Sequence, residues 1–192
     1  MNNTLAEQLL QEAQVLQQGH FLLTSGRHSD RYMQCAYLFQ QPQWAGKLCQ
    51  LLCDQWQDAG IDTVVGPAVG AVQMAYEVSR QLGCRNLFAE RVDGILTLRR
   101  GFSLQPGEKV LVVEDTVTTG GTVREVIALC NSIGAVVVGV GSIVDRSGGA
   151  VDFGVPFKSA FRAHVESWLA EDCPLCKQNL AFDKPGSRIV NR

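Results

Sequence analysis

The sequence lacks the features that mark several large classes of protein. It contains no cluster of basic residues, and its 17 lysines and arginines are balanced by 19 acidic residues, so we expect no nucleic-acid partner. Its apolar runs are far too short to cross a bilayer, so we expect no membrane association. Its first residues show no cationic segment followed by an apolar block, which argues against a signal peptide. A cytoplasmic location is therefore expected.

Histidine is scarce, and the three histidines occur singly, at positions 20, 28 and 164. No Ser-His-Asp or Cys-His arrangement is visible, which disfavours hydrolysis through a covalent nucleophile. Most of the seven cysteines lie in apolar surroundings and are expected to be buried, reduced thiols.

Cys173 and Cys176 form a single C-x-x-C pair. A zinc ribbon needs a second pair or histidines nearby in the sequence, and neither is present. We therefore expect a tight turn here and assign no metal ligands. A metal or redox site, including a zinc site shared between two subunits, stays an alternative.

The hydrophobic pattern predicts one α/β domain covering residues 1–192. Thr4 and Glu7 have capping-box spacing, and apolar residues from Leu5 to Leu16 predict a first helix that ends at Gly19. Strand-like alternation follows over 21–39. Further on, helical and strand-like patterns alternate, which predicts a central, mostly parallel sheet flanked by helices. The expected helices are 44–59, 69–82 and 120–133, and the expected strands are 61–65, 86–90, 109–115, 135–144 and 160–165.

The segment Val110–Thr122, VLVVEDTVTTGGT, carries most of the functional information. An apolar strand leads to adjacent carboxylates, Glu114 and Asp115, and then to a Thr/Gly loop before a helix. Glycines and a helix N-terminus present N–H groups to an anion, while the carboxylates suit sugar hydroxyls or a developing cation. We therefore predict a sugar-phosphate site. No Lys follows Gly120 or Gly121, which excludes a P-loop, and the dinucleotide fingerprint is also absent. An ordinary strand–turn–helix connection is the alternative.

This segment resembles the ribosyl-pyrophosphate signature of type I phosphoribosyltransferases. Three more segments occur in family order and make the sequence similar to the orotate-using members. Residues 21–32, FLLTSGRHSDRY, resemble the amino-terminal substrate loop. Residues 65–71, VGPAVGA, resemble the pyrophosphate loop, and residues 144–149, VDRSGG, resemble the segment whose arginine meets the base.

The resemblance implies a type I phosphoribosyltransferase fold with a core at 60–150, a hood and tail formed by 1–40 and about 155–192, and a flexible flap at 91–107. It implies orotate and phosphoribosyl pyrophosphate as substrates, and a homodimer. Mg²⁺ is implied because pyrophosphate needs a counter-charge. This ion would be held mostly by the substrate and water. The residues implied to bind phosphoribosyl pyrophosphate are Glu114, Asp115, Thr116, Val117, Thr118, Thr119, Gly120, Gly121 and Thr122.

The same resemblance places the base near Arg146, with Thr118, Tyr32 and Met33 as further contacts. Met33 departs from the aromatic pair of the family. Many members also have a catalytic loop rich in lysine, whereas this chain has no lysine between Lys47 and Lys109. The arginines of the corresponding flap are expected to be catalytic, with a solvated surface as the alternative: Arg91, Arg99 and Arg100. Two other functions are considered, namely transfer to another base and non-catalytic sensing of phosphoribosyl pyrophosphate.

Overall fold

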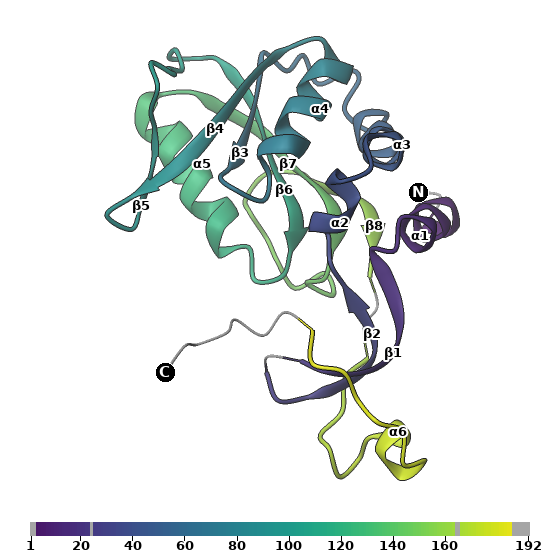
Figure 1. Ribbon diagram of the computed structural model, residues 1–192. Helices are drawn as coiled ribbons and strands as arrows, with labels where there is room; N and C mark the ends of the chain where they lie inside the picture. The colour runs from purple at the N-terminus through teal and green to yellow at the C-terminus, as the bar shows by residue number, and fades with distance from the viewer. Residues whose placement is uncertain (1–2, 24, 164–165, 186–192) are drawn as a thin grey trace.

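A six-stranded sheet in the order β5-β4-β3-β6-β7-β8 forms the centre of the computed structural model, which describes residues 3–23, 25–163 and 166–185 (Figure 1). All neighbouring strands pair in parallel except β4 and β5, which form an antiparallel hairpin. The predicted α/β class with a mostly parallel sheet is therefore confirmed. The strands are β3 (Thr63–Pro67), β4 (Arg85–Val92), β5 (Ile95–Leu98), β6 (Lys109–Val117), β7 (Val136–Asp145) and β8 (Phe157–Arg162).

The sheet is covered by helices on both faces, because its central strand has two apolar faces. Side chains alternate along a strand, so Leu111 and Val113 of β6 join one core cluster while Val110 and Val112 join the other. The first cluster lies under α3 (Pro42–Cys53) and α4 (Val72–Leu82), and the second under α5 (Gly121–Ile133). β6 is thereby fixed from both sides, and its carboxyl end becomes a rigid support for the loop that follows.

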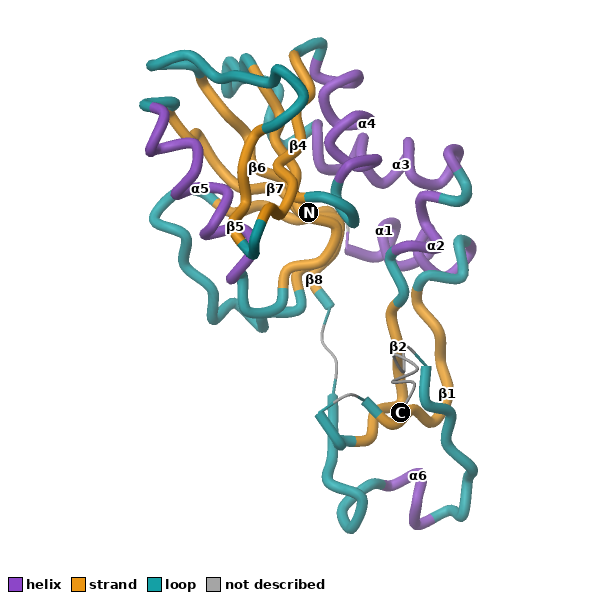
Figure 2. Tube along the Cα trace, turned by 60° about the vertical axis from the view of Figure 1, so that its left-hand side comes forward, coloured by secondary structure: helices purple, strands orange, loops and turns teal. Residues whose placement is uncertain are grey.

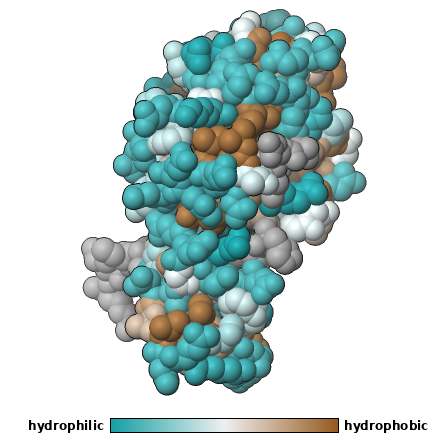
Figure 3. Space-filling view, turned by 90° about the vertical axis from the view of Figure 1, so that its right-hand side faces the viewer, coloured by the Kyte–Doolittle hydropathy of each residue, from teal (hydrophilic) through white to brown (hydrophobic). Residues whose placement is uncertain are grey.

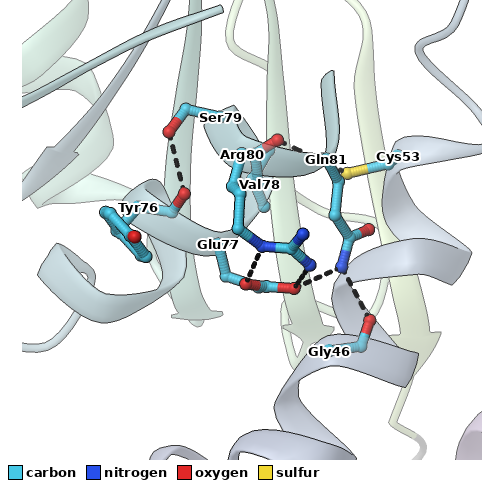
Figure 4. A network of polar contacts seen from close by, with 8 residues as sticks. All are labelled: Gly46, Cys53, Tyr76, Glu77, Val78, Ser79, Arg80 and Gln81. Carbon is cyan, nitrogen blue, oxygen red and sulfur yellow. Dashed lines mark hydrogen bonds and ion pairs between the residues drawn. The ribbon is translucent and has the colours of Figure 1, made fainter. Parts of the chain in front are cut away.

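Helices α3 and α4 are joined by a polar network around Glu77 (Figure 4). Arg80 donates two hydrogen bonds to the Glu77 carboxylate, at 2.8 and 2.9 Å, and these bonds lower the pKa of that carboxyl. The Gln81 amide donates both to Glu77 and to the carbonyl of Gly46 on α3, at 2.6 and 2.9 Å. This network fixes α4, which follows the loop after β3.

The amino-terminal helix is shorter than the sequence predicted. α1 spans Asn3–Glu12, and Leu16 and Gly19 lie instead in a strand, β1 (Leu16–Leu22). The chain turns at Gln14, whose φ is +56°, and β1 then pairs antiparallel with β2 (His28–Met33). Leu16 is buried in this hairpin, where it pairs with Met33. The pairing of distant strands therefore decides the structure here, against the helical spacing of the apolar residues.

The hairpin β1–β2 extends away from the main sheet and is joined there by residues 166–185, which include the short α6 (Pro174–Lys177) (Figures 1 and 2). Phe21 pairs with Asp183, and His28 pairs with Trp168. We call the hairpin and these residues the second lobe. The short α2 (Ala36–Phe39) leads from the hairpin back to α3. No helix among the described residues is long and apolar enough to cross a membrane.

Candidate active site

The predicted acidic pair lies at the carboxyl edge of the main sheet, at the end of β6. Glu114 pairs in register with Ser142, and Val117 with Asp145, so the ends of β6 and β7 lie side by side. The Arg146 N–H also donates to the Val117 carbonyl at 2.8 Å. The structure therefore brings the acidic pair and the predicted base-binding segment to one edge, where open α/β sheets bind their ligands.

The two carboxylates are held in a partly buried environment that disfavours their charged forms. Burial, together with the charge of Asp115, raises the pKa of Glu114 to about 8, and burial raises the pKa of Asp115. Neither carboxylate has a basic partner among the ion pairs of the described residues. A site of this kind favours hydroxyl donors or a positive charge beside it.

The Thr/Gly loop after β6 encloses a cavity of about 250 Å³. Gly120 precedes α5 with a left-handed φ of +73°, and a Cβ atom there would lie 2.7 Å from the Phe153 ring. Only glycine fits this position without displacing the ring. The first residues of α5 line this cavity, and the first N–H groups of a helix have no acceptor within the helix itself. The cavity is lined by Glu114, Thr116, Val117, Thr118, Thr119, Gly120, Gly121, Thr122, Val123 and Glu125.

The end of β3 and the loop after it, residues 65–71, approach the acidic pair from the neighbouring strand. A Cβ atom built on Gly70 would lie 3.5 Å from the Asp115 carboxylate, so the backbone of this loop passes close to that side chain. The peptide bond between Ala68 and Val69 is cis, and the Val69 side chain is 86% exposed. The structure thus brings together two of the segments singled out in the sequence.

Cys35 joins the amino-terminal hairpin to this site, and sequence analysis missed it. The Thr116 hydroxyl lies 2.8 Å from the Cys35 sulfur. Burial, and next the charge of Asp115, raise the pKa of the Cys35 thiol to about 12, while Arg146 acts in the opposite direction. The buried Cys35 thiol therefore contacts Thr116 and is influenced by the charges of Asp115 and Arg146. No signal in the sequence singles out this cysteine from the other apolar ones.

Tyr32 and Met33 do not form a single wall beside the site. Because neighbouring residues of a strand point to opposite faces, their side chains diverge. Met33 is buried in the first core cluster, whereas Tyr32 is half-buried with its ring 5.6 Å from that of Phe21. A shared contact of both side chains with one flat base does not follow from this arrangement.

The flap arginines are exposed, and two of them are held by acidic partners. Arg91 donates to both oxygens of Glu125 on α5, at 2.8 and 2.9 Å, and Arg100 donates to both oxygens of Glu90, at 2.8 Å. Arg99 is exposed on the same hairpin, near Glu90. Arg91 is therefore positioned beside the loop cavity, because Glu125 lines that cavity.

The Cys173–Cys176 pair was expected to form a turn; Cys173 directly precedes the one-turn helix α6, and Cys176 lies within it. His20 and His28, which are about 150 positions away in the sequence, lie against these two cysteines. No histidine lies near the two cysteines in the sequence, so the sequence carries no local signal of this arrangement. His164 lies outside the described residues.

Comparison with known proteins shows what this chain is similar to. The family model for the phosphoribosyl transferase domain matches residues 42–161. The curated orotate phosphoribosyltransferase of Caldanaerobacter subterraneus subsp. tengcongensis is 51% identical over 94% of this chain and 95% of its own length. That of Thermotoga maritima is 52% identical over 96% of this chain and 98% of its own length.

Solved structures agree with the fold. The orotate phosphoribosyltransferase of Aeropyrum pernix matches with a TM-score of 0.70 at 24% identity, covering 82% of this chain and 93% of that one. The Mycobacterium tuberculosis enzyme in complex with inorganic phosphate matches with a TM-score of 0.65 at 26% identity, covering 82% and 94% of the two chains.

Proposed function

The chain belongs to the orotate phosphoribosyltransferases of the phosphoribosyltransferase family, and we infer that it transfers ribose 5-phosphate from phosphoribosyl pyrophosphate to orotate. The products are orotidine 5′-monophosphate and pyrophosphate, a reaction of pyrimidine biosynthesis. Apart from the similarity to known orotate phosphoribosyltransferases, one structural observation supports this inference. The acidic pair of β6 and the Thr/Gly loop before α5 lie next to each other at the carboxyl edge of the sheet.

The reaction breaks the bond between C1 of the ribose and pyrophosphate and forms a bond from C1 to a ring nitrogen of orotate. Positive charge develops on the sugar as the leaving group departs, as in glycoside cleavage. We propose that Glu114 and Asp115 accept hydrogen bonds from the ribose hydroxyls and stabilise this charge. The partly buried pair supports these roles, because hydroxyl donors and a nearby cation both relieve the unfavourable burial of its charge.

The Thr/Gly loop is proposed to bind the 5-phosphate of the substrate. Its cavity of about 250 Å³ is lined by threonines and by the first residues of α5. These groups donate hydrogen bonds to phosphate oxygens, and the helix dipole adds partial positive charge. The backbone of residues 66–71, which passes beside Asp115, is proposed to face the pyrophosphate.

Mg²⁺ is part of the proposal. The donor set fits this ion, because two adjacent carboxylates offer hard oxygen ligands and lack a cationic partner among the described ion pairs. A cation beside them would offset the burial that raises their pKa values. Glu114 and Asp115 would contribute to holding it, directly or through water. When bound, the ion supplies charge neutralisation for the pyrophosphate.

Arg146 is proposed to bind orotate. It follows β7 at the edge where the acidic pair lies, and its guanidinium matches the carboxylate and carbonyl oxygens of the base. Thr118 and Tyr32 are proposed as further base contacts. Arg91, Arg99 and Arg100 are proposed to offset the charge of pyrophosphate. A homodimer in the cytoplasm, as the resemblance implies, completes the proposal.

A spectrophotometric assay of orotate consumption, with phosphoribosyl pyrophosphate and Mg²⁺, tests this function. We expect turnover with orotate and none with adenine or hypoxanthine. Asp115→Asn and Arg146→Ala are expected to lower turnover by about 100-fold or more. Asp58→Asn and Lys47→Ala, which change charges of the same sign at exposed positions, serve as controls and are expected to keep wild-type rates.

Each alternative function predicts a different result in this assay. Turnover with another base and none with orotate would indicate a different phosphoribosyltransferase. Binding of phosphoribosyl pyrophosphate without turnover of any base would indicate a sensor. Wild-type rates in both Asp115→Asn and Arg146→Ala would contradict the assignment of these residues.

A further inference from the structure

Four side chains with nitrogen or sulfur ligand atoms converge in the second lobe, away from the acidic pair. They come from β1, from the first residue of β2, and from the segment around α6. Their ligand atoms all lie within 4.8 Å of one another, and three of the four residues are buried. We call this group the tail cluster: His20, His28, Cys173 and Cys176.

The distances in the tail cluster approach those around a tetrahedral metal ion. Zinc–nitrogen bonds of about 2.0 Å and zinc–sulfur bonds of about 2.3 Å place neighbouring ligand atoms roughly 3.3–3.8 Å apart. The His20 Nε2 atom lies 3.5 Å from the Cys173 sulfur and 3.7 Å from the Cys176 sulfur. The Cys176 sulfur lies 3.3 Å from His28 Nδ1.

The two histidine nitrogens are closer, at 2.7 Å, which is a hydrogen-bond distance. Their separation needs to increase by only about 0.6 Å to reach the edge of such a tetrahedron. Both imidazoles already place a ring nitrogen close to a cysteine sulfur. A small displacement of the rings is therefore enough to admit an ion.

The proton on His20 is fixed on the side away from the cluster. Its Nδ1 atom lies 2.8 Å from the carbonyl oxygen of Leu180, which can only accept a hydrogen bond. Nδ1 therefore carries the proton, and Nε2 presents a lone pair to the cluster. A backbone carbonyl that orients a ring in this way is the usual outer partner of a histidine that binds metal.

The second lobe has little apolar core of its own to stabilise it. Leu169, Leu180 and Phe182 are each about half exposed, and α6 has no buried residue. Figure 3 shows hydrophobic side chains at the surface of this lobe. Small units with so little buried apolar surface are usually stabilised by a metal ion or disulfides, and both cysteines here are free.

We propose that the tail cluster binds one structural zinc ion. Two thiolates and two imidazoles form a closed, four-coordinate set, which is typical of structural zinc and leaves no open position for catalysis. Phe182 covers the site, with its ring 5.7 Å from that of His20 and 5.1 Å from that of His28. The ion would attach residues 173–183 to the hairpin, which carries the segment resembling the substrate loop.

Metal analysis of the full chain tests the proposal. The protein is purified under reducing conditions, exposed to equimolar Zn²⁺ and passed through a desalting column before elemental analysis. We expect about one zinc per chain, and a loss of most of it in Cys173→Ser and in Cys176→Ser. Cys84→Ser changes a half-buried thiol outside the cluster and is expected to keep the ion. Zinc below one tenth per chain in the wild type, or unchanged zinc in both cluster variants, would overturn the proposal.

Cobalt substitution of the wild type gives an answer that does not depend on whether a variant folds. Replacement of zinc by Co²⁺ is expected to give the intense visible and thiolate charge-transfer bands of a tetrahedral site with two sulfurs. A weak, octahedral-type spectrum would contradict the proposed ligands. A Cys173–Cys176 disulfide found by mass spectrometry in protein purified without oxidant would also contradict them.

Discussion

Arg91 and Glu125 join the flap to the helix that follows the Thr/Gly loop. The guanidinium donates to both carboxylate oxygens, at 2.8 and 2.9 Å, and Glu125 itself lines the loop cavity. A carboxylate beside a phosphate site is electrostatically unfavourable, and Arg91 offsets its charge. The pair is exposed, so it contributes little to stability. Its effect is expected on substrate binding.

Replacement of Arg91 by alanine is expected to raise the KM for phosphoribosyl pyrophosphate by about 5- to 20-fold, because Glu125 is left as an unbalanced negative charge near the substrate. Steady-state kinetics measure this effect. Arg91→Ala/Glu125→Gln is expected to recover part of the loss, since it removes that charge as well. The single variant Glu125→Gln completes the comparison. If the fold change in KM of the double variant equals the product of the fold changes of the two single variants, the pair is not coupled. Lys47→Ala, which removes an exposed positive charge on α3, is the control.

Gly120→Ala is expected to destabilise the fold by about 1–3 kcal/mol, because its φ of +73° is left-handed and the new methyl group would lie 2.7 Å from Phe153. Gly121→Ala is a matched control: Gly121 is the first residue of α5, and its Cβ would have the Thr119 hydroxyl at 3.9 Å as its nearest neighbour. Denaturant unfolding of both variants measures the difference. Equal midpoints would show that the loop conformation does not depend on glycine at position 120.

Stability is expected to fall as the pH rises from about 4.5 to about 8, because Glu114 keeps its proton in the folded protein over this range and loses it in the unfolded chain. Glu114→Gln removes this dependence. It is expected to be more stable than the wild type by about 2–4 kcal/mol at pH 9, while the two proteins differ little at pH 4.5. Thermal unfolding of both proteins across this pH range measures the effect, with the exposed Glu12→Gln as control. A difference that does not depend on pH would contradict the raised pKa of Glu114.

Glu114→Gln is also expected to lose most of its orotate turnover, because an amide cannot match a carboxylate as a partner for the ribose hydroxyls and the developing charge. The orotate assay at pH 8 measures this loss. A variant that is both more stable and fully active would show that Glu114 has no part in the reaction.

The elements that the sequence predicted well are those with strong local signals. Helices α4 and α5 end at Gly83 and Gly134, both with positive φ, and β6 begins at Lys109, as expected. These boundaries were predictable because a glycine after an apolar periodic pattern stops a helix locally. The proximity of residues 144–149 to residues 110–122 was implied only by the resemblance, because the sequence does not give the order of the strands. In the structure β6 and β7 are adjacent and parallel, so their carboxyl ends share one edge.

The features that the sequence did not reveal depend on contacts between distant segments. The end of α1 and the start of β1 are set by the pairing of β1 with β2. β8 begins at Phe157, three residues before the predicted strand, because its pairing with β7 starts there, at Val140. The placement of Cys35 beside Thr116, across 81 positions, has no local signal. The tail cluster is hidden for the same reason, since its histidines and cysteines are brought together only by the folded second lobe.

A crystal structure of the protein with phosphoribosyl pyrophosphate and Mg²⁺ tests the central claim most directly. We predict the 5-phosphate in the cavity lined by residues 116–122, with the ribose hydroxyls within hydrogen-bond distance of Glu114 and Asp115. The second lobe offers a different location, a cavity of about 470 Å³ lined by residues that include His20, Asp30 and Arg31. A pentose bound there, with no phosphate in the Thr/Gly loop, would contradict the account.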